Sequence, residues 1–331
     1  REKTEKEPAT GRIETVDPQP EGYRNGFSHM LIEAKNLIFR GAPGTGKSYL
    51  AKEIAADIVS DGYFDDYTLL TDEQKKQVEF VQFHPSYDYS DFVEGLRPKL
   101  NADGSMGFTL RDGIFKKFVA RARVNYENAQ GSTETLKKYI FIIDEINRGE
   151  ISKIFGELFF AIDPGYRGRA GEISTQYSNL HSDPDEKFYI PENLYIIGTM
   201  NDIDRSVDSF DFAMRRRFRF VELKADERLE MLASLENEEL KNEAIGRMGD
   251  LNKAIAGVED LNENYQIGAA YFLKLKTLSF DQLWTDYLQP LLQEYVRGMY
   301  DEERLMDRFA KAYGYQRPVR GDTNEAAEDP G

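Results

Sequence analysis

The sequence predicts an α/β fold: a parallel sheet with helices on both faces, followed by a smaller helical domain. Apolar runs rich in β-branched residues alternate with segments of helical periodicity over the first two thirds of the chain, which is typical of parallel sheets buried on both faces. After residue 225 the periodicity is helical, apart from a break at 262–270. We therefore expect an α/β nucleotide-binding domain at 27–223 and a helical domain at 224–320.

The predicted elements follow in order along the chain. An amphipathic stretch from Ser28 leads into an apolar strand at 37–39 and a helix at 49–58. Further strands are expected at 78–83, 139–144, 194–199 and 218–223, and helices at 113–124, 152–162, 228–235, 248–255 and 280–299. Turn residues around Pro164-Gly165 and Asp183-Pro184 predict a hairpin inserted at about 165–191.

The two ends of the sequence are predicted to be flexible. Residues 1–26 are charged, contain Pro and Gly and lack apolar periodicity, which is typical of a linker or mobile arm. Residues 321–331 form an acidic tail rich in small residues, which we expect to be frayed. Because the chain opens at Arg1 rather than Met, we also expect it to be a fragment that lacks an N-terminal portion.

Composition excludes several classes of protein. The 331 residues carry a net charge of −16, which argues against a self-sufficient nucleic-acid binder. The absence of cysteine excludes disulfides and thiolate metal sites, and the three histidines have no ligand spacing. No apolar run approaches the roughly 20 residues of a membrane span, so we expect a cytoplasmic protein without membrane contact. Catalysis must rest on carboxylates, arginines and Mg²⁺.

Residues 41–48 read GAPGTGKS and fit the phosphate-binding pattern G-x-x-x-x-G-K-[ST] between a predicted strand and a predicted helix. The glycines let successive backbone N–H groups face an anion at the positive end of the helix. Lys47 can reach the outer phosphates, and Ser48 can ligate Mg²⁺. We therefore expect nucleoside-triphosphate binding. The candidate nucleotide-binding residues are Gly41, Pro43, Gly44, Thr45, Gly46, Lys47, Ser48 and Tyr49.

Acidic and amide side chains follow two later strands. The apolar run 139–144 ends in Asp144-Glu145, at the sheet edge where open α/β folds bind ligands. We expect Asp144 to hold Mg²⁺ together with Ser48, and Glu145 to orient or deprotonate the attacking water. Asn201 follows the next strand and can place an amide near the γ-phosphate and the water.

Four arginines lie close together at Arg215, Arg216, Arg217 and Arg219. The positive charges of such closely spaced arginines repel one another unless an anion lies opposite them. In an oligomer, a neighbour's nucleotide would be that anion, with the arginine supplied in trans to stabilise transition-state charge. The alternative is a solvated basic turn paired with local acids.

Several motifs together resemble a known family. They are GAPGTGKS, VQFHPSYDYSDFVEGLRP, GIFKKF, YIFIIDEINR, ISKIFGELFFAID, FYIPENLYIIGTMNDIDRS and DFAMRRRFRF. The chain resembles the AAA+ motor subunits of McrBC-type modification-dependent restriction systems from about residue 36 to 220, and more weakly through YQIGAAYF. The resemblance implies an AAA+ P-loop NTPase with a five-stranded sheet in the order 5-1-4-3-2, a helical lid and assembly into a ring, which we expect to be a hexamer.

The resemblance also implies a function and assigns residues. The family hydrolyses GTP, with Mg²⁺, and passes the energy to a partner, here an McrC-like nuclease or activator. DNA would be recognised by a domain absent from this chain. The resemblance makes Asn201, Asp204 and Arg205 the signature group. Arg148 becomes an interface cation, and Arg216 and Arg217 become candidate trans arginines.

One departure and two rival functions remain open. Where relatives read G-H-S-Y-F, residues 268–272 read GAAYF, which leaves a lid contact to nucleotide in question. The DEINR and RRRF elements are shared with MoxR-like AAA+ ATPases that remodel proteins, so ATP is the alternative nucleotide. A nucleotide-gated scaffold is the third interpretation, although the intact Glu145 argues against it. No short sequence motif determines whether the site prefers guanine or adenine.

Overall fold

The computed structural model describes residues 22–131, 134–203 and 212–316. Its sheet has five parallel strands, in the order β2-β5-β6-β1-β7. These strands are β1 (Asn36–Gly41), β2 (Val78–Gln82), β5 (Tyr139–Asp144), β6 (Leu194–Asn201) and β7 (Arg219–Leu223). Numbered among themselves and read from the β7 edge, they run 5-1-4-3-2. The predicted fold class and strand order are confirmed.

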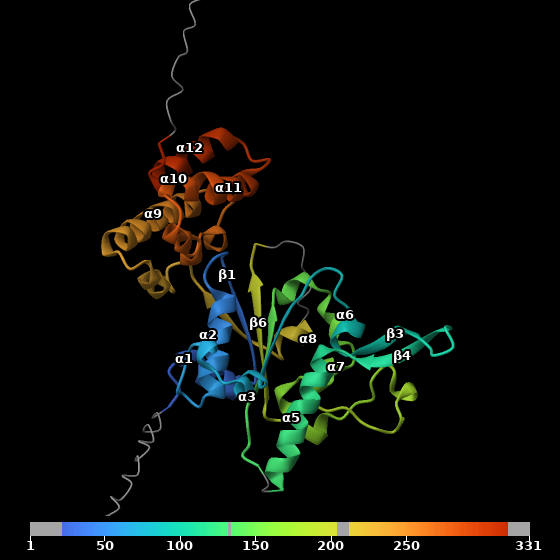
Figure 1. Ribbon diagram of the computed structural model, residues 1–331. Helices are drawn as coiled ribbons and strands as arrows, with labels where there is room; N and C mark the ends of the chain where they lie inside the picture. Colours follow the sequence, from blue (N-terminus) through green and yellow to red (C-terminus); the bar gives the residue numbers. More distant parts are fainter. Residues whose placement is uncertain (1–21, 132–133, 204–211, 317–331) are drawn as a thin grey trace, which may run out of the picture.

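Helices cover both faces of this sheet (Figure 1). Side chains of β5 alternate between two cores, because successive residues of a strand point to opposite faces. Ile140 and Ile142 pack with α1 (Gly26–Ala34) and α2 (Lys47–Val59). Phe141 and Ile143 pack against the other helices. These helices are α4 (Tyr89–Phe92), α5 (Ile114–Gln130), α6 (Ile151–Phe155), α7 (Leu158–Ala161) and α8 (Phe212–Arg215). The short α3 (Asp72–Lys75) precedes β2.

The predicted hairpin at 165–191 is wrong. That segment contains the 3-10 turns η3 (Pro164–Tyr166), η4 (Gly168–Gly171) and η5 (Ser178–Leu180), with one isolated antiparallel bridge between Ile173 and Phe188. The Pro and Gly residues that suggested a hairpin turn recur too often to leave two uninterrupted strands. The predicted helix at 152–162 is likewise divided into α6 and α7, with Gly156 between them at φ 50°.

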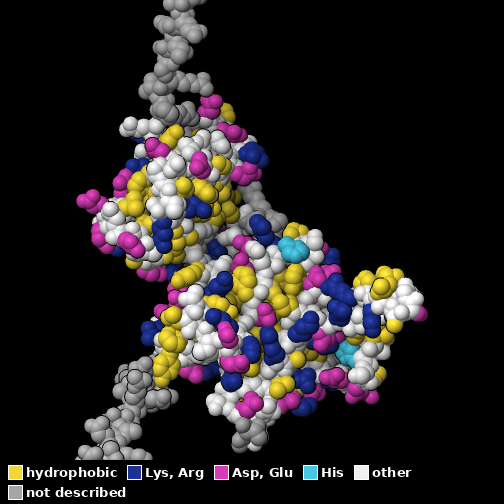
Figure 2. All heavy atoms as spheres, viewed as in Figure 1, with side chains coloured by type: hydrophobic (Ala, Val, Ile, Leu, Met, Phe, Trp, Pro, Cys, Tyr) yellow, Lys and Arg dark blue, Asp and Glu magenta, His cyan; other side chains and the backbone are white. Residues whose placement is uncertain are grey.

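A hairpin forms instead between β2 and α5, from β3 (Glu94–Leu100) and β4 (Met106–Asp112). The register pairs Leu96 with Leu110, Pro98 with Phe108 and Leu100 with Met106. Opposite residues of paired strands share a face, so one face of the hairpin is apolar. Phe108 and Met106 are each 72% exposed, and apolar side chains gather at the end of this projecting hairpin (Figure 2).

The folded part begins earlier than the predicted limit at residue 27. The backbone N–H groups of Arg24 and Asn25 donate to the Asp57 carboxylate at 2.9 and 3.0 Å. Asn25 also caps α1. Residues 22–26 are therefore part of the fold and not of a flexible arm. The rest of that predicted arm, and the predicted tail at 321–331, lie outside the described residues.

Residues 229–313 form a helical part with its own core, which includes Phe272, Trp284 and Phe309. Its elements are η6 (Leu229–Leu235), α9 (Glu238–Ala256), η7 (Glu263–Tyr265), η8 (Ala269–Lys276), α10 (Phe280–Leu283), η9 (Trp284–Leu288), α11 (Gln289–Val296) and α12 (Glu302–Tyr313). Of the helices described, none combines the length and apolarity needed to cross a membrane. The division of the chain at 223/224 stays a prediction.

Candidate active site

The loop between β1 and α2 has a backbone that requires glycine. Gly41, Gly44 and Gly46 have φ values of 143°, 76° and 80°, a region that residues with a Cβ rarely adopt. A Cβ on Gly41 would lie 2.2 Å from the carbonyl oxygen of Leu223 on β7. No side chain caps the N-terminus of α2. Its first N–H groups therefore remain available to an anion.

Lys47 is buried inside this loop. It is 7% exposed, and its Nζ donates to the carbonyl oxygens of Ala42 and Gly41 at 2.7 and 3.1 Å. The buried Thr45 hydroxyl lies 3.3 Å from the same Nζ. Burial lowers the pKa of Lys47 to about 8, although the charges of nearby carboxylates, Glu145 first, oppose the shift. A phosphate bound to the loop would stabilise the charged ammonium further.

The ends of β5 and β6 join the loop at Asp144. The Ser48 hydroxyl donates to Asp144 Oδ1, and Thr199 Oγ1 donates to the same oxygen at 2.6 Å. The backbone N–H of Glu145 donates to Thr199 Oγ1 at 3.2 Å. Sequence reasoning missed Thr199, although a hydroxyl residue at the end of an apolar strand beside the acidic strand was a usable signal. Thr199 fixes both acids relative to the loop.

Hydroxyl and carboxylate oxygens are the ligands that Mg²⁺ takes, and the ion usually keeps waters and binds substrate phosphates as well. Ser48 and Asp144 present such a pair. Within the described ranges, no group of three or more His, Asp or Glu side chains is placed to hold a metal. This donor set therefore fits an ion whose shell is completed by a nucleotide, and does not fit a fully protein-enclosed metal.

Glu145 and Asn201 lie together, at the ends of β5 and β6. Asn201 Nδ2 donates to Glu145 Oε1 at 2.6 Å. Glu145 has φ 51°, a left-handed conformation that is unusual for a residue with a side chain and often marks a functional site. Arg148 Nε lies 3.9 Å from Glu145 Oε2. Asn147, which sequence reasoning missed, donates to the carbonyl oxygen of Asn201 at 3.3 Å and so joins the same two strand ends.

The arginines predicted as trans fingers differ in their surroundings. Arg216 is exposed. Arg217 is 8% exposed, and its guanidinium donates to the carbonyl oxygen of Ala213 at 2.6 Å and lies 3.7 Å from Asp163. The Arg217 guanidinium thus has contacts within its own chain, and its assignment as a trans arginine stays a prediction. Arg219 lies 3.9 Å from Glu33. Asp204 and Arg205 lie outside the described residues.

The segment 268–272 contacts the phosphate loop through its backbone. The N–H of Gly268 donates to the carbonyl oxygen of Pro43, and the N–H of Ala270 donates to that of Gly44, each at 2.9 Å. A Cβ on Gly268 would lie 2.2 Å from the carbonyl carbon of Gly44. The helical part therefore reaches the loop without the missing histidine.

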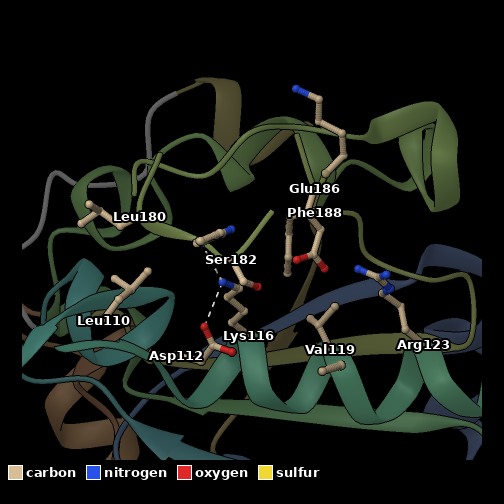
Figure 3. A pocket seen from close by; sticks show the side chains of 12 residues that line it. Leu110, Asp112, Lys116, Val119, Arg123, Leu180, Ser182, Glu186 and Phe188 are labelled. Carbon is tan, nitrogen blue, oxygen red and sulfur yellow. Dashed lines mark hydrogen bonds and ion pairs between the residues drawn. The ribbon is translucent and has the colours of Figure 1, made fainter. Parts of the chain in front are cut away.

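Cavities lie in different places among the described residues. One of about 480 Å³ lies between α2 and the helical part, with Gly46 and Tyr49 in its wall. Another, of about 340 Å³, lies between β4, α5 and the segment 180–188 (Figure 3), and its lining includes no residue of the phosphate loop. There Lys116 bonds Asp112 at 2.8 Å and the buried Glu94 at 2.5 Å. These ion pairs explain Lys116 as a structural residue of that cavity.

Comparison with known proteins decides the family. Residues 36–218 match the family described as AAA domain (dynein-related subfamily), and residues 243–304 match the one described as McrB, alpha-helical lid domain. The chain belongs to the McrB-type AAA+ subunits. This confirms the resemblance predicted from the sequence motifs, and it places the chain among AAA+ NTPases.

Two relatives come from restriction systems. The "Type IV methyl-directed restriction enzyme EcoKMcrB subunit" of Escherichia coli (strain K12) is 36% identical over 279 residues, which cover 80% of this chain and 54% of that protein. The "Type II restriction enzyme BsuMI component YdiS" of Bacillus subtilis (strain 168) is 28% identical over 222 residues, 60% of either protein. This McrB-type chain thus spans little more than half the length of these relatives.

Proposed function

We propose that the chain is a GTP-hydrolysing AAA+ ring motor that drives a partner nuclease in McrBC-like restriction of modified DNA. The observation that carries the proposal is the meeting of three strand ends at the phosphate loop. Lys47 lies in that loop, Asp144 is bonded to both Ser48 and Thr199, and Glu145 is bonded to Asn201. This is the set of groups that phosphoanhydride hydrolysis requires.

Each group has a separate task in this proposal. The loop N–H groups and the Lys47 ammonium bind the β- and γ-phosphates. Ser48 and Asp144 would hold Mg²⁺, which supplies positive charge to the phosphate oxygens when it is bound. Glu145 takes the proton of the attacking water. The Asn201 amide fixes the Glu145 carboxylate and the water, and so limits the geometries that Glu145 can adopt.

Arginines complete the site in an assembled ring. We assign Arg216, which is exposed on the turn after α8, to a neighbouring subunit's nucleotide, where its charge would stabilise the transition state. Arg148 follows Glu145 on the short turn η2 (Ile146–Arg148) and serves the same interface. Asp204 and Arg205 complete the signature group in this proposal. The ring is expected to be a hexamer.

The choice of GTP and of the partner rests on family membership. The chain belongs to the McrB-type AAA+ subunits, and both relatives carry restriction-enzyme names. The unmatched length of these relatives leaves room for a DNA-recognition domain outside the matched residues. We expect an McrC-like nuclease or activator to bind the ring and to accelerate turnover.

The test is a turnover assay of the purified chain with GTP and with ATP, each with and without an McrC-like partner. The proposal requires Mg²⁺-dependent GTP hydrolysis that rises when the partner is added. Hydrolysis of ATP alone, without response to the partner, would favour a protein-remodelling ATPase. Binding of nucleotide without turnover would favour the nucleotide-gated scaffold.

A further inference from the structure

The cavity of about 480 Å³ adjoins the point where a bound nucleotide leaves the phosphate loop. Gly46 of the loop and Tyr49, one residue after Ser48, form part of its wall. The rest of a nucleotide must extend from its phosphates into adjoining space. At the other end of the loop, beside Gly41 and Ala42, a cavity holds only about 10 Å³, which is room for about one water. Of these two cavities, the larger has the room that a nucleoside needs.

The walls of this cavity offer both an apolar surface and a charged pair. The Tyr49 side chain is 58% exposed, so its ring face is open to stacking by a base. Met231, from η6, lies across from the loop, and a Cβ on Gly46 would come within 2.6 Å of its methyl group. Arg228 Nη2 donates to Glu53 Oε2 at 2.7 Å, and both residues line the cavity.

We propose that this cavity is a guanine-reading pocket, in which Glu53 accepts from the base and Arg228 donates to it. The inference rests on the proposed GTP hydrolysis and names the residues that select the base. Glu53 and Arg228 come from α2 and from the residue before η6, and their side chains are 21% and 10% exposed. They are therefore largely withdrawn from water, which strengthens their hydrogen bonds to a ligand.

The hydrogen-bonding edge of guanine matches this pair better than that of adenine. Guanine presents the O6 acceptor next to two donors, N1–H and the 2-amino group, and a carboxylate accepts two parallel hydrogen bonds. Adenine has one amino donor next to the N1 lone pair and no 2-amino group. A carboxylate oxygen that faces N1 of adenine cannot form a hydrogen bond there, because both atoms are acceptors. A site built around such groups leaves them unpaired with the wrong base, which costs affinity.

A purely structural role for the pair makes a different prediction. Arg228 also lies 2.6 Å from Glu230, so the Glu53–Arg228 pair could simply join α2 to the helical part. Loss of such a structural ion pair would weaken the binding of every nucleotide equally, because each nucleotide needs the same arrangement of α2 and the helical part. Loss of a base-reading carboxylate changes the ratio between nucleotides. The ratio, and not the affinity alone, separates these two roles.

The experiment measures equilibrium binding of GDP, inosine diphosphate and ADP, with Mg²⁺, to the full chain and to Glu53→Gln. Inosine diphosphate lacks only the 2-amino group of guanine. We expect the wild-type chain to bind GDP about 10- to 100-fold more tightly than inosine diphosphate, the usual scale for a hydrogen bond to a charged group. Glu53→Gln should lose most of that ratio and should raise ADP affinity, because the Gln amide can donate a hydrogen bond to N1 of adenine.

Glu222→Gln is the matched control, because Glu222 pairs with Arg40 at 3.1 Å outside this cavity, and it should keep the wild-type ratios. The inference is overturned if Glu53→Gln keeps the wild-type ratio of GDP affinity to inosine diphosphate affinity, or if it loses affinity equally for all three nucleotides. In either case, a wild-type chain that prefers GDP to ADP leaves the proposed function standing. A wild-type chain that prefers ADP overturns the proposed GTP function first, and the inference with it.

Discussion

Replacing Glu145 by Gln should separate nucleotide binding from turnover. The structure limits what this substitution changes, because Gln retains the Oε1 acceptor that Asn201 Nδ2 reaches at 2.6 Å. The backbone N–H of residue 145 also keeps its bond to Thr199. What is lost is the basic carboxylate. The phosphate-binding groups of the loop, Lys47 among them, are untouched.

The expected size of the effect follows from general-base catalysis. Loss of a positioned base typically costs about 10²- to 10⁴-fold in rate, or about 3 to 5 kcal/mol of barrier at ~1.36 kcal/mol per decade. Affinity for GTP should stay within about threefold of wild type, since Glu145 acts on the water and not on the ground-state phosphates. Single-turnover hydrolysis and equilibrium GTP binding measure the two quantities separately.

Glu150→Gln is the matched control. Glu150 is an exposed carboxylate five positions further along the chain, and its Oε2 lies 2.5 Å from Lys153 Nζ. The Glu150→Gln variant should hydrolyse GTP at the wild-type rate. If Glu145→Gln also did so, Glu145 would have no part in the mechanism, and the alignment of Asn201 with Glu145 would be structural only.

Four further predictions concern the charge of Lys47, the stability of the fold, metal binding and assembly. Lys47 is charged below its pKa of about 8 and loses that charge as the pH rises. GTP affinity should therefore fall by up to about tenfold per pH unit above pH 8, and a GTP affinity that stays constant to pH 10 would contradict this. Lys47→Ala should abolish GTP binding at every pH. Because the pKa of Lys47 is lowered from 10.5, the folded chain binds fewer protons than the unfolded chain between about pH 8 and 10.5, and this residue's contribution to the free energy of unfolding should rise with pH there. Thr199→Val removes the hydroxyl that donates to Asp144 and should raise the Mg²⁺ concentration for half-maximal turnover by about tenfold. Circular dichroism verifies that the variant folds. An unchanged Mg²⁺ requirement would show that Ser48 alone positions Asp144. Mixing Arg216→Ala with Lys47→Ala subunits should restore part of the GTPase activity that each variant lacks, and no recovery in mixed rings verified by mass would place Arg216 in cis or outside catalysis.

The sequence was most informative where chemistry and local structure coincide. The strand at 139–144 is buried along its whole length, and its apolar run could end only where polar residues begin, so its limits were predicted correctly. The phosphate loop needs glycine at φ values that other residues avoid. Its position between β1 and α2 could therefore be predicted from the sequence pattern alone.

Features set by tertiary packing were predicted less well. Arg216 and Arg217 are equivalent in sequence, and only the packing of Arg217 near Asp163 and Phe159 shows that its guanidinium faces inward. The β3–β4 hairpin escaped notice because its apolar face is exposed, and exposed residues in alternation resemble an ordinary polar loop when Pro98 interrupts them. Thr199 is identified only by the acid that lies on the neighbouring strand.

We propose that this McrB-type chain uses GTP at the site formed by the phosphate loop, Asp144 and Glu145. Equilibrium competition between GTP and ATP for the isolated chain, titrated with Mg²⁺, tests this proposal. GTP should displace ATP with an affinity higher by orders of magnitude, because groups that recognise guanine are left unpaired with adenine. Comparable affinities, or tighter binding of ATP, would contradict it and favour an ATP-dependent, protein-remodelling function.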